Sequence, residues 1–363
     1  MVFVKNGSES VIPIIPRLRS NILTAPSGCN ICLTISKVTK CGTAIVISEA
    51  TRQKVLAVIE ENQYSPVTGS RNNPSYSTNK KLNIGLIIES VYNHLYIEME
   101  DIISIRFHNA GYTILSFHDN YFSQDKKEKF EELLEYINEH NLSGLVYLGG
   151  NFENIPKETF QKLPCPTIFV NTVLPVAYYD TNYSSVQSNH FDAGEMQMNQ
   201  LIRNGHKNIA LLISSMVDNS VYGLRLKGYK QALANAGLEY NFNHIVEGDY
   251  TYSKSYQNIK KHLEQYPEIT AVCCSADIMI PSLIRAIHDI SKTPGKDIEI
   301  ISFDGLEMLE YCIPSVSSFK QPKTEMVDTI YDLLLGLINK SRNNQHITFK
   351  CNLIVRESCK CDI

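Results

Sequence analysis

The sequence predicts an α/β protein in which a small N-terminal module precedes a body of two lobes, each built on a parallel sheet. The 363 residues exceed what one core usually encloses, given about 100–200 residues per domain. Hydrophobic residues make up 43% of the chain and charged residues 20%, as in globular proteins. From residue 82 onward, short apolar runs alternate with amphipathic stretches, the pattern of a parallel sheet covered by helices on both faces.

The charge of the chain divides between its two ends. Residues 1–81 hold ten Lys and Arg against four Glu and no Asp, a balance of +6, which leaves 24 basic against 34 acidic residues, or −10, for the rest. A basic head on an acidic body is typical of a head that contacts phosphates. Pro13 and Pro16 interrupt the only early apolar patch, and no run reaches the roughly 18 apolar residues of a spanning helix. We therefore expect a cytoplasmic protein with no membrane partner.

The body reads as two successive series of strands and helices. In the first series the apolar and amphipathic runs predict a strand at 83–90, a helix over 96–110, a strand at 112–118, a helix over 126–141 and strands at 144–150 and 167–172. In the second they predict helices over 191–204, 224–236, 254–265 and 278–290, alternating with strands at 208–214, 244–250, 271–276 and 298–305.

The last predicted elements are a helix over 323–340 and a strand within 349–358, and they must pack on or pair with the sheets that the earlier strands form. A chain that crosses between the lobes provides them, with lobe one formed by 82–184 and 320–342 and lobe two by 185–319 and 343–363. A head over 1–63 and a linker over 64–81, rich in Ser, Asn, Pro and Thr, precede the body. A cleft between two such lobes binds ligands at the carboxyl ends of the strands.

The ten cysteines are interpreted as reduced thiols, because most lie in apolar runs, as Cys273 and Cys274 do, or stand alone. Cys29 and Cys32, with Cys41 nearby, have a spacing that zinc uses, but no fourth ligand lies near them in the sequence, so we expect neither a metal nor a cofactor. The chain also lacks G-x-S-x-G, G-x-x-x-x-G-K-[ST] and H-E-x-x-H, so we do not expect an enzyme.

The stretch VISEATRQKVLAVIEENQYSP, residues 46–66, resembles the end of a LacI/GalR head, with Ser48 capping a helix. Further fragments are similar to signatures of that family and follow in its order: GHKNIALL, RLKGYKQAL, ISFDG, SSFKQP and IVRES. The resemblance implies a helix-turn-helix head, a periplasmic-binding-protein-like body, a homodimer, operator DNA as a partner and a small-molecule effector, usually a sugar. The apolar residues Ile278, Leu283, Ile284 and Ile287 on one helix also suggest a dimer.

Upstream of residue 46 the resemblance weakens. TISKV, residues 34–38, is similar to the start of the recognition helix that the family seats in the major groove. The candidate DNA contacts there and in the linker are Cys32, Leu33, Thr34, Ser36, Lys37 and Arg71. Cys32 and Leu33 lack the donors and acceptors that read base edges, and Pro26 disfavours the preceding helix. The family's minor-groove wedge is matched by Asn73, so we predict weak, poorly selective DNA binding.

The resemblance also assigns ligand contacts in the body. Arg225 lies in an R-x-x-G-[FY] pattern whose arginine clamps the ligand in the family; without the resemblance it reads as a surface Arg on an amphipathic helix. Asp304 would accept hydrogen bonds from sugar hydroxyls, although Asp-Gly is also an ordinary turn. Tyr250 would stack on a sugar face or be a core residue. The remaining candidates, placed around the cleft, are Asn171, Tyr96 and Gln321, the last equally suited to capping the next helix.

One position departs from the family. Ala276-Asp277 stands where the family commonly has Asn-Asp, which implies a different ligand or one with fewer hydroxyls. The sequence therefore predicts a ligand-responsive DNA-binding transcription regulator that acts as a repressor. The alternatives are a ligand sensor that has lost specific operator binding and a sugar-binding component of a transporter.

Overall fold

The computed structural model describes residues 2–6, 10–14, 82–90, 92–119, 125–153, 155–174, 182–214, 220–248 and 251–360. The chain divides into two compact units between Lys80 and Lys81. In the first unit, strands β1 (Val2–Asn6) and β2 (Ser10–Ile14) pair antiparallel, with Val2 opposite Ile14. The sequence did not predict these two strands. The remaining residues of the expected head and linker lie outside the described part of the chain.

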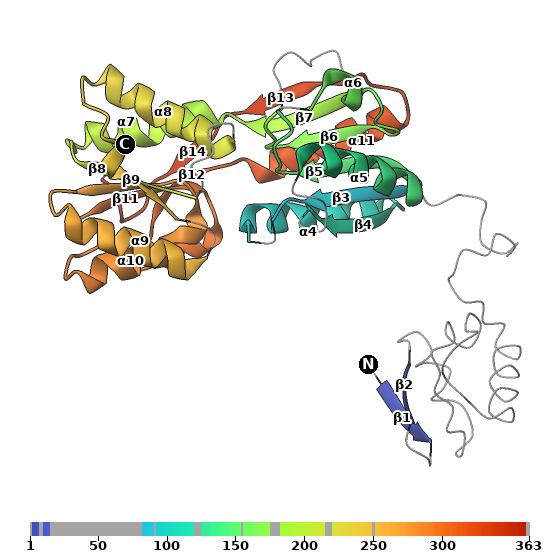
Figure 1. Ribbon diagram of the computed structural model, residues 1–363, viewed down its shortest axis with the longest axis horizontal. Coiled ribbons are helices and arrows are strands. Elements are labelled where there is room, and N and C mark those ends of the chain that lie inside the picture. The colour runs from blue at the N-terminus through green and yellow to red at the C-terminus, as the bar shows by residue number, and fades with distance from the viewer. Residues whose placement is uncertain are drawn as a thin grey trace, which may run out of the picture. The chain divides into compact units, whose positions relative to one another are not determined.

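Lobe one of the second unit is a six-stranded sheet in the order β13-β7-β6-β5-β3-β4, in which every neighbouring pair is parallel (Figure 1). Parallel strands need crossover connections, which the helices provide. The strands and helices of this lobe are β3 (Asn83–Ile88), α4 (His94–Asn109), β4 (Thr113–His118), α5 (Lys126–Glu139), β5 (Leu142–Leu148), α6 (Lys157–Phe160), β6 (Thr167–Val170), β7 (Tyr183–Ser188), α11 (Lys323–Ile338) and β13 (His346–Phe349).

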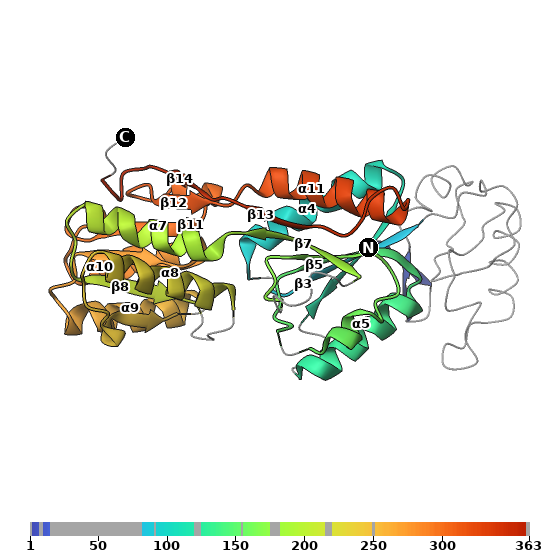
Figure 2. The same cartoon turned by 90° about the horizontal axis from the view of Figure 1, so that it is seen from above.

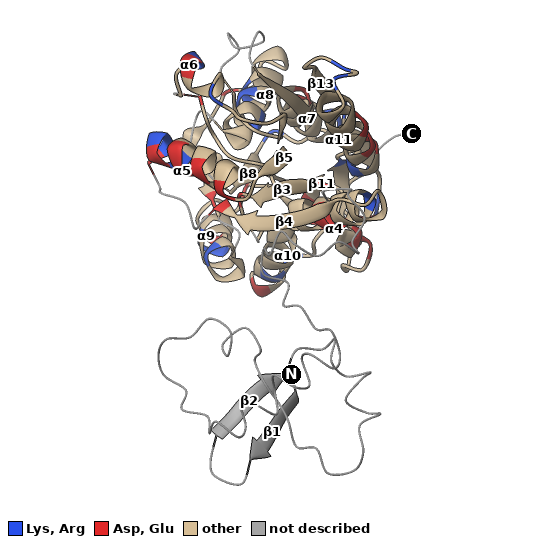
Figure 3. Ribbon diagram, turned by 90° about the vertical axis from the view of Figure 1, so that its right-hand side faces the viewer, with Lys and Arg blue, Asp and Glu red and all other residues tan. Residues whose placement is uncertain are grey.

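Helices cover both faces of the lobe-one sheet. Helices α4 and α11 lie together on one face, and α5 lies on the other (Figure 2). The Asp125 side chain caps α5 by accepting from the backbone N–H groups of Lys127 and Glu128, 2.9 and 3.0 Å away. Phe130 and Leu133 of this helix are fully buried against the sheet. Acidic residues recur along α5 on the outer surface, which accounts for part of the negative charge of the body (Figure 3).

Lobe two is a second six-stranded sheet, in the order β14-β12-β11-β10-β8-β9, with only β14 antiparallel to its neighbour. Helices α7 and α8 cover one face, and α9 and α10 cover the other (Figure 1). Its elements are α7 (His190–Arg203), β8 (Ile209–Ile213), α8 (Val221–Asn235), η4 (Phe242–His244), β9 (Ile245–Glu247), α9 (Tyr252–Gln265), β10 (Ala271–Cys274), η5 (Asp277–Met279), α10 (Ile280–Asp289), β11 (Glu299–Asp304), η6 (Glu307–Glu310), β12 (Ser317–Lys320) and β14 (Asn352–Ile354).

The apolar residues around α10 do not form a free face. Ile278, Leu283 and Ile287 are 5%, 0% and 0% exposed and belong to the core of lobe two, and Ile284 is half-buried against it. The sequence-based argument that this helix has apolar surface left over for a dimer was therefore wrong. Its own lobe buries three of the four residues and part of Ile284.

The chain crosses between the lobes three times, and all three crossings fall later than the sequence suggested. Strand β7 lies in lobe one, so the first crossing follows Ser188 and not residue 184. The second lies at Gln321, between β12 of lobe two and α11 of lobe one. Strand β13 also pairs within lobe one, which moves the third crossing from residue 342 to a point after Phe349.

Candidate functional site

Polar side chains gather where the strands of both lobes end. Asn171 follows β6 in lobe one, Asp304 is the last residue of β11 in lobe two, and Gln321 follows β12 at the second crossing. All three are buried, with 1%, 9% and 2% of their surface exposed. Because the carboxyl ends of parallel strands share one edge of a sheet, this arrangement brings the polar groups of the two lobes together.

A line of hydrogen bonds joins these residues. The Asn171 amide donates from Nδ2 to Oε1 of Gln321 at 2.8 Å, and Nε2 of Gln321 donates to Oδ1 of Asp304, also at 2.8 Å. Ser188, which ends β7, donates from its hydroxyl to the same Gln321 oxygen at 2.6 Å, and its backbone N–H donates to Asn171. In the described part of the chain the Gln321 side chain therefore links the lobes, and no side chain caps α11.

Two of these residues have a backbone conformation that side chains rarely adopt. The φ angle is 47° at Asn171 and 125° at Asp304. Asparagine tolerates the left-handed region, but an aspartate at 125° is strained. Such strain persists only where surrounding contacts hold it, and it concentrates at binding sites. Gln321 supplies such contacts at both positions, accepting from Asn171 and donating to Asp304.

Arg225 is held on helix α8 with its guanidinium group inside the protein. It is 3% exposed and donates from Nη1 to the Ser275 carbonyl and from Nε to the Val221 carbonyl at 3.4 Å. Its Cζ lies 4.2 Å from the ring centre of Phe303 and 4.8 Å from that of Tyr222. Cation–π contacts of this kind stabilise a partly desolvated guanidinium. They hold it beside the end of β11.

Two glycines let α7 and α8 approach closely enough to seat Arg225. A Cβ atom on Gly194 would lie 2.8 Å from the Cα of Arg225, and one on Gly228 would lie 2.6 Å from the backbone nitrogen of Glu195. Real Cβ atoms do not come so near backbone atoms. In the Arg225-x-x-Gly228 pattern, the glycine thus allows the two helices to pack closely, whereas the arginine places its guanidinium group in the site.

The Arg225 guanidinium acts on the charge of the Asp304 carboxyl. Burial raises the pKa of the Asp304 carboxyl to about 6, and the Arg225 guanidinium acts in the opposite direction. Burial also raises the pKa of Tyr96 well above its usual range, so its hydroxyl stays protonated. Tyr96 is 3% exposed on α4, and both Asp304 and Arg225 act on it electrostatically. The structure therefore brings Tyr96, Arg225, Asn171, Asp304 and Gln321 to one place.

Asp277 has a supporting position that the sequence did not indicate. It is fully buried at the start of η5 and accepts from the Leu306 N–H at 2.7 Å and from the Ser318 hydroxyl at 2.9 Å. These bonds hold the loop that follows Asp304. Burial raises the pKa of the Asp277 carboxyl to about 8. Neighbouring Ala276 is 2% exposed and brings no polar group.

Other predicted residues lie outside the described part of the chain. These are Tyr250 and the DNA-contact candidates Cys32, Leu33, Thr34, Ser36, Lys37 and Arg71. Three residues that the sequence did not indicate also belong to the site or lie beside it: Ser188 contacts Gln321, Asp277 holds the loop after Asp304, and the charge of Glu89 acts on Tyr96. Ser188 and Glu89 stand at a strand's carboxyl end, the one signal that could have identified them.

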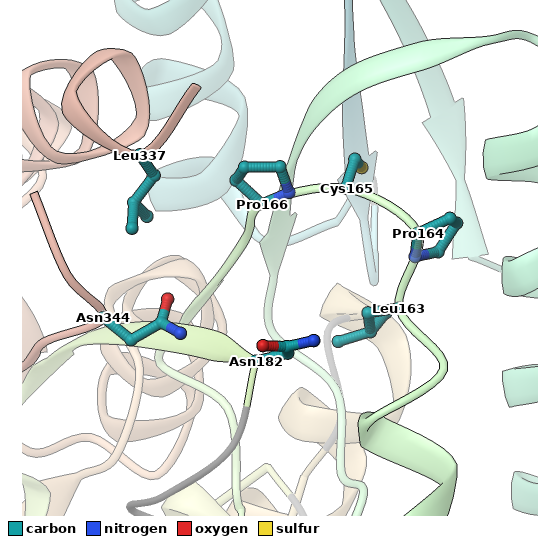
Figure 4. A pocket seen from close by; sticks show the side chains of 7 residues that line it. All are labelled: Leu163, Pro164, Cys165, Pro166, Asn182, Leu337 and Asn344. Atoms are coloured by element: carbon teal, nitrogen blue, oxygen red, sulfur yellow. The ribbon is translucent and has the colours of Figure 1, made fainter. Parts of the chain in front are cut away.

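The described cysteines are free thiols. Cys165, Cys273, Cys274, Cys351 and Cys359 are buried, and Cys312 is half-buried. Burial raises the pKa of Cys165 to about 12, which makes it an unreactive thiol. Cys165 lines a pocket of about 230 Å³ whose walls come from the loop before β6, with Asn182, Leu337 and Asn344 (Figure 4). This pocket lies at the amino ends of β6 and β7, the opposite edge from the polar site.

The chain is similar to known regulators over most of its length. A model of the periplasmic binding protein-like domain matches residues 198–359. The HTH-type transcriptional regulator MalR of Clostridium butyricum is 31% identical over 316 residues, which cover 86% of this chain and 91% of that protein. The chain belongs to the LacI/GalR family. Catabolite control protein A of Priestia megaterium is 29% identical, over 81% of this chain and 85% of that protein.

Solved structures show the same fold. The Lac repressor bound to ONPG matches with a TM-score of 0.67 at 22% identity, covering 89% of this chain and 94% of the repressor chain. The CelR–cellobiose complex matches with a TM-score of 0.65 at 21% identity and the same coverage.

Membership of the LacI/GalR family makes the chain a ligand-responsive, DNA-binding transcription regulator. Its relatives are regulators and not enzymes. Within the described residues, no helix has the length and apolar character needed to cross a membrane.

Proposed function

We propose that this LacI/GalR-family chain is a repressor whose affinity for operator DNA is set by a sugar or similar polyhydroxylated metabolite bound between the two lobes. The line of hydrogen bonds from Asn171 through Gln321 to Asp304 carries this proposal, because it joins polar groups of both lobes at one point. A ligand there would contact both lobes at once. It could then favour one arrangement of the lobes over another.

The proposed contacts suit hydroxyl groups. The Asp304 carboxylate would accept hydrogen bonds from two hydroxyls, and the Arg225 guanidinium would donate to a third oxygen. The side-chain amides of Asn171 and Gln321 offer both a donor and an acceptor. Tyr96 would donate from its protonated hydroxyl. Tyr250 remains a predicted stacking partner for a sugar face.

Ligands of solved structures with this fold support the choice of effector class. One is the CelR–cellobiose complex, and another is a LacI-type regulator of Alkaliphilus metalliredigens complexed with D-xylulofuranose. Ala276 brings no hydrogen-bonding side chain to the site. Because an unpaired buried polar group is costly, we infer an effector with fewer hydroxyls on the side that faces Ala276.

The regulator would act as a homodimer in the cytoplasm, the compartment that holds the DNA. Two heads on a two-fold axis can match the two halves of an operator site. A structure of a dimeric Lac repressor shares this fold, with a TM-score of 0.67. Effector binding in the body would change how the two heads fit those half-sites.

The test is the thermal stability of the full chain with a panel of mono- and disaccharides. A ligand that binds only the folded state stabilises it by about 2.7 kcal/mol at a hundredfold excess over Kd, which raises Tm. Arg225→Ala should abolish the rise, whereas Arg285→Ala, an exposed arginine of the same lobe, should leave it intact. Asp304→Asn serves as a second variant in case Arg225→Ala fails to fold. An unchanged response in both site variants would place the ligand elsewhere.

A second candidate is a ligand sensor that no longer binds a specific operator. Pro26 and Gly28 disfavour the helix that precedes the recognition helix, and Cys32 and Leu33 offer no base-reading groups. A sugar-induced rise in Tm without any preference for the chain's own upstream DNA would favour this candidate. A role in delivering sugar to a transporter has no such support, since the relatives are transcription regulators.

A further inference from the structure

Glu89 stands at the carboxyl end of β3, beside the proposed effector site. Its backbone N–H donates to the Leu148 carbonyl at 2.9 Å, which fixes the start of the side chain. The side chain lies over Gly149, where an added Cβ would come within 2.8 Å of the Glu89 Cβ and of the Tyr96 ring. The carboxylate also accepts from the Gly150 backbone. Glu89 is thus next to Tyr96, which the site already includes.

The exposure and the neighbours of Glu89 indicate that its side chain lines a cleft. Water reaches its side chain, which is exposed, although Tyr96 beside it is 3% exposed. Protein nevertheless surrounds the carboxyl closely enough that desolvation raises its pKa. Its charge also acts on Tyr222, which belongs to α8 of lobe two. The Glu89 carboxyl is thus exposed to water, partly desolvated by the surrounding protein and close enough to act on Tyr222 of the facing lobe. A carboxyl with these three properties lines the space between the lobes.

No cation balances this carboxylate within the described residues. Lys129 is near, but its ammonium is bound to Asp119 at 2.7 Å, and Asp119 also accepts from the Tyr147 hydroxyl. The Arg225 guanidinium is held by the Ser275 carbonyl and the Phe303 ring. The site therefore presents two carboxyls, Glu89 and Asp304, for one guanidinium. A partly desolvated carboxylate without a cation is costly and favours a cationic ligand.

We propose that Glu89 binds a protonated amino group of the effector, so that the effector is an amino sugar. An ammonium group offers three donors to the carboxylate, and Asp304 and Arg225 remain free for the hydroxyls. This inference rests on the proposed function, because it takes the sugar site between the lobes as given. It adds the charge of the ligand, which neither the family nor the rest of the site specifies.

Calorimetric titration of the full chain tests the effect of the ligand's charge separately from that of its shape. The probes are glucosamine and galactosamine, their neutral counterparts glucose and galactose, and N-acetylglucosamine, which keeps the nitrogen without its charge. We expect an amino sugar to bind about tenfold or more tighter than its neutral counterpart. Glu89→Gln should remove most of that preference. Glu135→Gln, an exposed position on α5, should leave it unchanged.

The outcomes separate the two proposals. If neutral sugars bind at least as tightly as amino sugars and Glu89→Gln changes nothing, the amino-sugar inference is wrong and the sugar site stands. Binding of N-acetylglucosamine as tight as that of glucosamine would also overturn it, because the charge would then be irrelevant. If no probe binds, or Arg225→Ala leaves all binding intact, the proposed function fails as well.

Discussion

Asn171 and Gln321, 150 residues apart in the chain, are joined by a hydrogen bond of 2.8 Å. Asn171 directly follows strand β6 of lobe one, and Gln321 lies where the chain leaves lobe two. Gln321 also donates to Asp304, so one side chain is hydrogen-bonded to both lobes. A ligand that competes for these amide groups would act directly on the connection between the lobes.

Gln321→Ala should therefore weaken both the fold and effector binding. The change removes one buried hydrogen-bond partner each from Asn171, Ser188 and Asp304, at a cost of about 1–3 kcal/mol of unfolding free energy. Chemical unfolding measures the stability, and calorimetry measures the affinity. Thr324→Ala, an exposed neighbour in the first turn of α11, provides the control. A Gln321 variant that matches this control in both measurements would show that the bridge is unimportant.

Gly228→Ala should destabilise the protein, against the usual effect of this substitution. In a helix, alanine is normally more stable than glycine by about 1 kcal/mol. Here the new Cβ would lie 2.6 Å from the Glu195 backbone, and overpacking costs about 1–3 kcal/mol. Because Arg225 lies one turn away, effector affinity should fall too. Urea unfolding measures whether the free energy of unfolding falls or rises, with Lys227→Ala on the exposed side of α8 as the control. A gain in stability would contradict the close packing of α7 and α8.

Most of the body could be predicted from sequence because its strands are apolar runs. Strand β8 (Ile209–Ile213) is entirely apolar and was expected at 208–214. Strand β7, YSSVQS, was missed, because four of its six residues are Ser or Gln although nearly all are buried. Missing it also misplaced the first crossing. Polar residues in a central strand are satisfied by partners from distant segments, such as Asn344 for Ser184, which periodicity cannot reveal.

The site was predictable only in part, for a similar reason. Family resemblance pointed to Arg225 and Asp304, and the ends of strands pointed to Asn171. Ser188 was missed because its strand was missed. Glu89 was included in a buried strand at 83–90, and only the structure separates it from the strand, which ends at Ile88. The side-chain partners of Gln321 depend on how the lobes meet, which no local pattern records.

Stability should fall as pH rises from about 6.5 to 8. Burial raises the pKa of Asp277 from 3.8 to about 8, so in this range the folded protein holds a proton that the unfolded chain has released. Since the folded state binds more protons, raising the pH favours unfolding. Urea unfolding at several pH values gives the slope, which Asp277→Asn should flatten. Asp289→Asn should keep the wild-type slope, because the Asp289 pKa lies at about 2. A wild-type curve that rises with pH would contradict the assignment.

The homodimer should depend on exposed apolar side chains other than those of α10. Tyr311 and Ile313, in the loop before β12, are 75% and 88% exposed, and Ile105 on α4 is 53% exposed. Large exposed apolar groups mark protein interfaces. Sedimentation should show a dimer at micromolar concentration, and Ile313→Asp should shift it toward monomer. Phe242→Asp, at a 63% exposed position elsewhere in lobe two, should not. A monomeric wild-type protein would contradict the dimer itself.

The full chain should bind DNA weakly and with little sequence preference. The balance of +6 over residues 1–81 favours contact with phosphates, which is strong at low salt and falls steeply as salt rises. Specific binding should be impaired, because Cys32, Leu33 and Asn73 replace base-reading and wedge residues, and each lost contact costs about 1–3 kcal/mol. The measurement compares the chain's own upstream region with a scrambled duplex near physiological salt. A preference of about a thousandfold or more, as specific regulators reach, would show that the head reads its operator by contacts that these residues do not reveal.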